Sequence, residues 1–100
     1  MLVPRGQGCF NVRFRMKDSV DGGRQRPTPP GMFRTVVKHQ TGSFSCGIFA
    51  GDDVCLTPGL EYDAEVLVLL EDARAGFLRG DDIEFWDGKI FASGKVTESI

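Results

Sequence analysis

The chain has no continuous apolar run of about 18 residues, which is the length that a membrane-spanning helix requires. It also lacks a long apolar stretch near its start, so the sequence predicts no signal peptide. We therefore expect a cytoplasmic protein that does not associate with membranes. Its 100 residues are enough for one domain with a modest hydrophobic core.

Histidine and cysteine are scarce. The only histidine is His39, and the cysteines are Cys9, Cys46 and Cys55, with no Cys-x-x-Cys pair among them. An odd number of scattered cysteines predicts neither a disulfide framework nor a zinc site. We expect free thiols, mostly buried as small apolar side chains in a reducing compartment, and we expect no metal and no other cofactor.

Candidate catalytic residues are correspondingly few. His39 with Cys46 or Cys55 is the conceivable nucleophilic pair, but no third residue is placed to orient it. We instead expect His39 to be solvated at the end of a strand. The paired acids Asp52-Asp53 and Asp81-Asp82 each follow a glycine and are interpreted as turn residues. An enzyme therefore ranks last among the functions considered, and we assign no catalytic residue.

Apolar and polar residues alternate along much of the chain. From Phe10 to Lys17 every second residue is apolar, which is typical of a strand with one buried face. Similar patterns predict strands over residues 10–17, 32–39, 43–50, 62–70, 82–86 and 90–97. Residues 71–78 are the one helical candidate, and we expect a loop with some helical turn there. Asp87-Gly88 predicts a hairpin between the last two strands.

Short strands separated by turn signals predict an all-β fold, and a closed antiparallel barrel is favoured because closure removes exposed strand edges. Residues 18–31 form a long, proline-rich loop between the first two strands, and loops of this length tend to be functional or disordered.

Charge is divided unevenly along the chain. Residues 1–40 hold eight basic and two acidic residues, a net charge of +6, whereas residues 41–100 hold four basic and twelve acidic residues, a net charge of −8. One interpretation is a charged partner surface. The other is that the barrel interleaves the two halves, so that opposite charges neutralise each other across strands. Both interpretations stay open at this point.

Several motifs resemble the third domain of translation elongation factor Tu. The run Asp21-Gly22-Gly23-Arg24-Gln25-Arg26-Pro27, followed by Phe33-Arg34-Thr35, is similar to a loop and strand of that domain. Leu56-Thr57-Pro58-Gly59 and the hairpin segment that ends Gly94-Lys95-Val96-Thr97 continue the resemblance, which covers residues 9–99. The resemblance implies a six-stranded antiparallel β-barrel over residues 9–100 that works by binding. In elongation factor Tu this barrel packs on the GTPase domain, contacts the T stem of tRNA and meets the exchange factor.

We expect a stand-alone copy of this barrel, preceded by a tail at residues 1–8. That tail contains Leu2-Val3-Pro4-Arg5-Gly6, the core of a common protease-cleavage tag, so it is either a tag remnant or a native start. The family's tRNA-contacting segment is shortened here to Pro30-Gly31-Met32, and its hairpin tip becomes Trp86-Asp87-Gly88-Lys89.

The predicted function is a small non-catalytic binding module, with another protein as the first choice of partner. RNA or tRNA binding is the alternative, although a net charge of −2 disfavours strong general affinity for RNA. Homo-oligomerisation also stays open. The predicted binding residues lie on and beside the loop at residues 21–35, where we expect solvated arginines that add little to folding. They are Arg24, Arg26, Arg34, Lys38 and His39.

Overall fold

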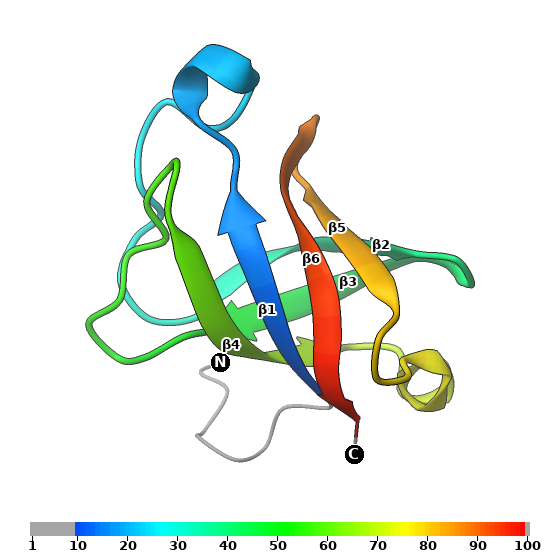
Figure 1. The fold of residues 1–100 in the computed structure, drawn as a ribbon. Helices are drawn as coiled ribbons and strands as arrows, with labels where there is room; N and C mark the ends of the chain where they lie inside the picture. The colour runs from blue at the N-terminus through cyan, green and yellow to red at the C-terminus, as the bar shows by residue number, and fades with distance from the viewer. Residues whose placement is uncertain (1–9, 100) are drawn as a thin grey trace.

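Six strands pair edge to edge around a ring in the computed structural model, which describes residues 10–99 (Figure 1). The strands are β1 (Phe10–Met16), β2 (Phe33–His39), β3 (Gly42–Phe49), β4 (Glu61–Val68), β5 (Asp82–Trp86) and β6 (Ile90–Ser99). Their order around the ring is β1, β4, β3, β2, β5 and β6, and β6 pairs back onto β1. Every pairing is antiparallel. The prediction of an all-β fold with a closed, six-stranded antiparallel barrel is confirmed.

The strand bounds follow the alternation of the sequence closely, with small differences at the ends. β4 ends at Val68, because the backbone turns away there into the short 3-10 helix η2 (Glu71–Gly76). The expectation of a loop with some helical turn at 71–78 is therefore confirmed. A second 3-10 turn, η1 (Ser19–Asp21), opens the long loop after β1. The predicted tail at residues 1–8, together with Cys9, lies outside the described residues.

Across residues 10–99, none of the helical segments has the length and apolar character needed to traverse a bilayer.

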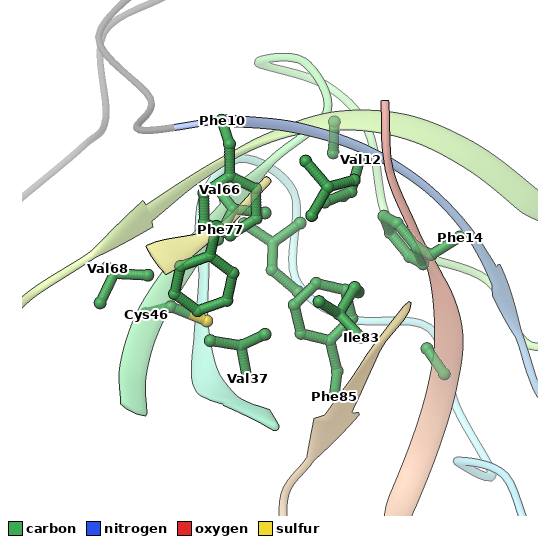
Figure 2. Close-up of a cluster of buried hydrophobic side chains, with 14 of the residues drawn as sticks. Phe10, Val12, Phe14, Val37, Cys46, Val66, Val68, Phe77, Ile83 and Phe85 are labelled. Carbon is green, nitrogen blue, oxygen red and sulfur yellow. The ribbon is translucent and has the colours of Figure 1, made fainter. Parts of the chain in front are cut away.

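The barrel interior is filled by the inward-facing half of each strand. In β1 these residues are Phe10, Val12, Phe14 and Met16, all of which are almost completely buried. Phe77, from the segment after η2, joins this cluster and stacks on the ring of Phe10 at a centroid distance of 4.4 Å (Figure 2). Complete burial of a side chain of this size stabilises the fold by roughly 1.5–3 kcal/mol.

The predicted β5–β6 hairpin is present, but its loop is longer than a two-residue turn. Trp86 pairs with Ile90, so residues 87–89 form the loop, and only Gly88 has a positive φ, of 90°. The register shifts between Phe85 and Trp86, which leaves Phe91 as an extra residue on β6. This bulge explains why two consecutive residues of β6, Phe91 and Ala92, are both buried.

The outer surface shows how the two oppositely charged halves of the sequence combine. Arg13 of β1 lies opposite Asp63 of β4, with its guanidinium 3.2 Å from that carboxylate and 3.3 Å from Glu61. Lys95 of β6 also lies 2.6 Å from Asp82 of β5, but both of these residues belong to the acidic half. The β1–β4 contact therefore pairs a basic strand with an acidic one, as the second interpretation of the charge asymmetry expects. Each such exposed pair adds little to stability on its own.

Gly94 sets the distance between β6 and β1. A Cβ added at Gly94 would overlap the carbonyl oxygen of Arg13 and lie 2.5 Å from Cα of Phe14. By contrast, a Cβ added at Gly76 would make an ordinary contact at 3.6 Å with Cγ2 of Thr41. The ring can close at this point because residue 94 has no side chain.

We predict that Gly94→Ala lowers the free energy of unfolding by about 1–3 kcal/mol, because the two strands must move apart. Gly76→Ala serves as the matched control and should stay within about 0.5 kcal/mol of the parent protein. Urea unfolding followed by circular dichroism measures both values. Equal stability of the two variants would show that the strands are not in close contact at Gly94.

Candidate binding site

The outer face of β2 carries two of the predicted binding residues. Alternation along β2 turns Arg34, Val36 and Lys38 outward, while Val37 is completely buried. On the β3 side their partners are the small residues Gly47, Ser45 and Ser43. On the β5 side Val36 lies opposite Trp86, and Lys38 lies opposite Glu84. We refer to Arg34, Val36, Lys38, Glu84 and Trp86 together as the Trp86 face.

Trp86 is the large aromatic residue of this face, and 37% of its surface is exposed. The ammonium of Lys38 lies 5.5 Å from the centre of a Trp86 ring, a favourable cation–π geometry. The backbone oxygen of Trp86 accepts a hydrogen bond of 2.8 Å from the hydroxyl of Thr35. Neighbouring residues therefore contact Trp86 on β2 while leaving much of it open to solvent.

The motifs in the sequence identify Trp86 only as part of a hairpin tip, and Trp86 is absent from the predicted binding residues. The signal was present, because Ile83 and Phe85 are the apolar inward residues of that strand. Period-2 alternation then places Trp86 on the outside.

Arg34 and Lys38 differ in how far their charges are already compensated. Lys38 has Glu84 directly across from it and the Trp86 ring beside it. Arg34 is exposed, faces a glycine across β3, and forms no ion pair with any residue between 10 and 99. Its planar guanidinium is therefore open to a carboxylate or phosphate from outside.

Arg24 does not lie free in solvent as the sequence analysis expected. Its guanidinium forms an ion pair with Asp87 at the β5–β6 hairpin tip, and only 24% of its side chain is exposed. The guanidinium carbon lies 5.0 Å from the ring centre of Phe33 and 6.0 Å from that of Phe91. The expectation of a solvated Arg24 is wrong, because this residue joins the long loop to the hairpin. Arg26 does remain exposed.

The long loop after β1 is held at several points. Lys89 donates a hydrogen bond of 2.9 Å to the backbone oxygen of Gly23, beside the Arg24–Asp87 pair. A Cβ at Gly23 would overlap the backbone of Lys17, and Gly22 has a φ of 89°, so the two glycines are needed for the turn. Buried Thr28 accepts a hydrogen bond of 2.9 Å from the backbone N–H of Leu56.

His39 occupies the last inward position of β2, and its side chain is completely buried. Its Nε2 lies 2.7 Å from a carboxylate oxygen of Asp81, and its Nδ1 lies 2.8 Å from the hydroxyl of Thr41. Nδ1 also accepts the backbone N–H of Thr41, so the proton of the neutral ring lies on Nε2 and is donated to Asp81. The ring packs on Phe77 at a centroid distance of 4.4 Å.

The expectation of a solvated strand-end histidine is therefore wrong, and His39 is separated from the exposed part of β2. The cause is its inward position, which follows the same period-2 pattern as Val37. Its partners also differ from the Cys–His pair considered from sequence. Of the described cysteines, Cys46 is buried and Cys55 is partly buried. No group of three or more potential metal-binding side chains occurs in the described part of the chain.

Asp81 receives two hydrogen bonds through one carboxylate oxygen. The backbone N–H of Leu78 donates at 3.0 Å, and His39 donates from the other side. The pKa of Asp81 lies below its ordinary value, first because of the Leu78 N–H and then because of His39. Asp81 is thus more than a turn residue, because it connects the β2–β3 hairpin to the segment before β5.

We predict that Arg24→Ala lowers the free energy of unfolding by about 1–2 kcal/mol, because the loop loses both its ion pair and its aromatic contacts. Arg34→Ala is the matched control and should change stability by no more than about 0.5 kcal/mol. Arg24→Lys should fall between them, because a lysine keeps the charge but not the planar stacking. Urea unfolding measures the free energy of unfolding of each variant. Equal effects of the two alanine variants would argue against a structural role for Arg24.

We also predict a specific acid dependence for Asp81. Because its folded-state pKa is depressed, its contribution to stability is present above the ordinary value of 3.8 and is lost as the pH falls below it. Asp81→Asn should therefore be less stable than the parent at neutral pH, and the difference should shrink on acidification. Urea unfolding across this range measures it, with Asp52→Asn at an exposed turn residue as the matched control. A difference for Asp81→Asn that does not change with pH would contradict the prediction.

Comparison with known proteins leaves the family open. No protein-family model matches the chain, and no curated protein sequence matches it significantly. The resemblance to the third domain of elongation factor Tu thus stays a prediction from the motifs quoted above. Since one barrel fold serves many functions, the function must be argued from the surface residues themselves.

Proposed function

We propose that this barrel is a non-catalytic binding module that docks another protein through the Trp86 face. The observation that carries the proposal is an exposed tryptophan lying on a paired sheet between two basic side chains, Arg34 and Lys38. Tryptophan and arginine are enriched among the residues that dominate the binding energy of protein interfaces. The face is built on paired strands, so little conformational entropy is lost when a partner orders it.

The chemistry of the face defines the partner's side of the contact. Trp86 and Val36 offer an apolar surface, and Arg34 offers a guanidinium without an ion-pair partner among residues 10–99. A partner with an apolar side chain next to a carboxylate would satisfy both groups, and arginine binds carboxylates in a bidentate geometry. The resemblance to an elongation-factor barrel supports a partner in translation.

RNA or tRNA is the second candidate, because bases stack on aromatic rings beside basic residues. Glu84 lies within the Trp86 face, directly opposite Lys38. Its carboxylate would repel the phosphate backbone, on which RNA affinity largely depends. The mixed charge of the face therefore favours a protein partner over RNA.

We predict that Trp86→Ala weakens capture of the partner by about thirtyfold, corresponding to about 2 kcal/mol, and that Arg34→Ala weakens it by a smaller amount. The measurement is affinity capture from a cell extract, identification of the retained protein, and titration of that purified protein. Arg15→Ala on β1 is the matched control, because β1 lies three strands from β2 in either direction around the ring. The proposal fails if Trp86→Ala and Arg34→Ala capture the same proteins as the parent and the Arg15→Ala control.

Tryptophan fluorescence tests the alternative that the Trp86 face binds RNA. Trp86 is the only tryptophan of the chain, so its fluorescence reports on contacts at this face. Titration with tRNA at about 50 and about 200 mM salt should leave the emission unchanged if the partner is a protein. A quench that weakens steeply with salt, and that the Arg34 variant lacks, would instead establish nucleic-acid binding.

A further inference from the structure

A second surface lies at the end of the barrel where the β2–β3 hairpin meets η2. Figure 1 shows η2 beside the tip of that hairpin. A groove of about 300 Å³ opens between them. The residues that line this groove, here called the η2 groove, are Thr41, Phe44, Leu70, Asp72, Ala73 and Gly76. Most of these lining groups are apolar, in contrast to the charged outer faces of the strands.

Exposed leucines flank η2 in the sequence. Leu70 comes directly before it and is 56% exposed, while Leu78 comes two residues after it and is 57% exposed. Neither leucine belongs to a strand, so strand alternation does not account for their exposure. Of the two, Leu70 also lines the η2 groove, where its exposed side chain adds to the apolar wall.

Charge at the groove indicates what would occupy it. Asp72 is the one charged residue lining the groove among the described residues, and it forms no ion pair with any of them. The nearest cation in the sequence, Arg74, is engaged elsewhere. Its Nε donates a hydrogen bond of 2.7 Å to the backbone oxygen of Val68, and its guanidinium lies 3.7 Å from Glu71. The groove therefore combines an apolar wall with one uncompensated carboxylate.

The groove is preformed by the fold. The ring of Phe44 packs edge-on against the buried Phe77 at a centroid distance of 6.0 Å. The backbone N–H of Ala73 donates to the oxygen of Leu70 at 3.1 Å, and Arg74 fixes η2 to the end of β4. Little conformational entropy would therefore be lost when a partner binds this surface.

We propose that the η2 groove binds one apolar side chain of a partner protein's linear segment, with an adjacent lysine or arginine of that segment pairing with Asp72. The apolar wall suits a leucine or phenylalanine side chain, and the adjacent cation would neutralise Asp72. This site selects the opposite charge from the Trp86 face, where Arg34 favours a carboxylate. It lies beyond the end of β2 and does not depend on the function proposed for that face.

The test uses three amidated, acetylated peptides titrated into the ¹⁵N-labelled protein: Gly-Lys-Leu-Lys-Gly, Gly-Glu-Leu-Glu-Gly and Gly-Lys-Ser-Lys-Gly. The lysine–leucine peptide should shift the amide signals of Thr41, Phe44 and Gly76 in a saturable way. The serine peptide lacks the apolar side chain and should cause no saturable shift. The glutamate peptide should bind more weakly, because Asp72 repels it.

Two variants separate the apolar and charged parts of the site. Gly76→Ala places a methyl group in the groove at an ordinary contact distance from Thr41, so it should weaken the lysine–leucine peptide without unfolding the protein. Asp72→Asn should reduce the preference for the lysine peptide over the glutamate peptide by about two- to fivefold, as expected for an exposed ion pair. Trp86→Ala is the control and should bind all three peptides as the parent does.

The proposal is overturned if the lysine–leucine peptide causes no saturable shift at the groove, or if the glutamate peptide binds equally well. Shifts centred on Trp86 that Trp86→Ala abolishes would also overturn it and would assign the peptide to the other face. Failure here leaves the Trp86 face untouched, because none of these measurements depends on its partner.

Discussion

Closure of the six-stranded sheet divides the side chains of each strand between a buried interior and a solvent-exposed surface. An open sheet leaves two edge strands free for pairing, whereas here β6 returns to β1 and each strand has two neighbours. Gly94 is one condition of that closure, because the two strands meet where any side chain would overlap the backbone of β1. The placement of the polar residues discussed above follows from this division.

His39 shows what closure requires of a polar residue. Its position in β2 points inward, so the ring cannot reach solvent and must find partners within the fold. Thr41 provides one partner from the hairpin itself, and Asp81 provides the other from a segment 42 residues away. Phe77 contacts both His39 and the core, because its ring is stacked on Phe10 and tilted against His39. One end of the barrel is thereby closed by a side chain from outside the strands, which also determines where η2 and its groove lie.

The sequence predicted the strands well because a strand's signal is local. Alternation within seven residues is enough to identify β1, and a glycine after an aspartate is enough to identify the last hairpin. The same alternation also predicts that His39 points inward and that Trp86 points outward. Neither position was among the predictions made from the sequence. Arg24 is a different case. Its partner Asp87 is 63 residues away in sequence, so no local pattern reveals that this arginine is a structural contact.

Net charge is a poor guide to the two proposed binding surfaces, and closure of the barrel explains why. Basic β1 lies beside acidic β4, and Arg24 forms an ion pair with Asp87, so that charges from the two halves of the chain compensate each other locally. A binding surface instead requires a charged side chain that has no ion-pair partner and that lies next to an exposed apolar side chain. Arg34 on the Trp86 face, and Asp72 beside Leu70 in the η2 groove, meet that condition within residues 10–99. The two surfaces proposed for this nearly neutral barrel therefore differ in the sign of the charge that they would select.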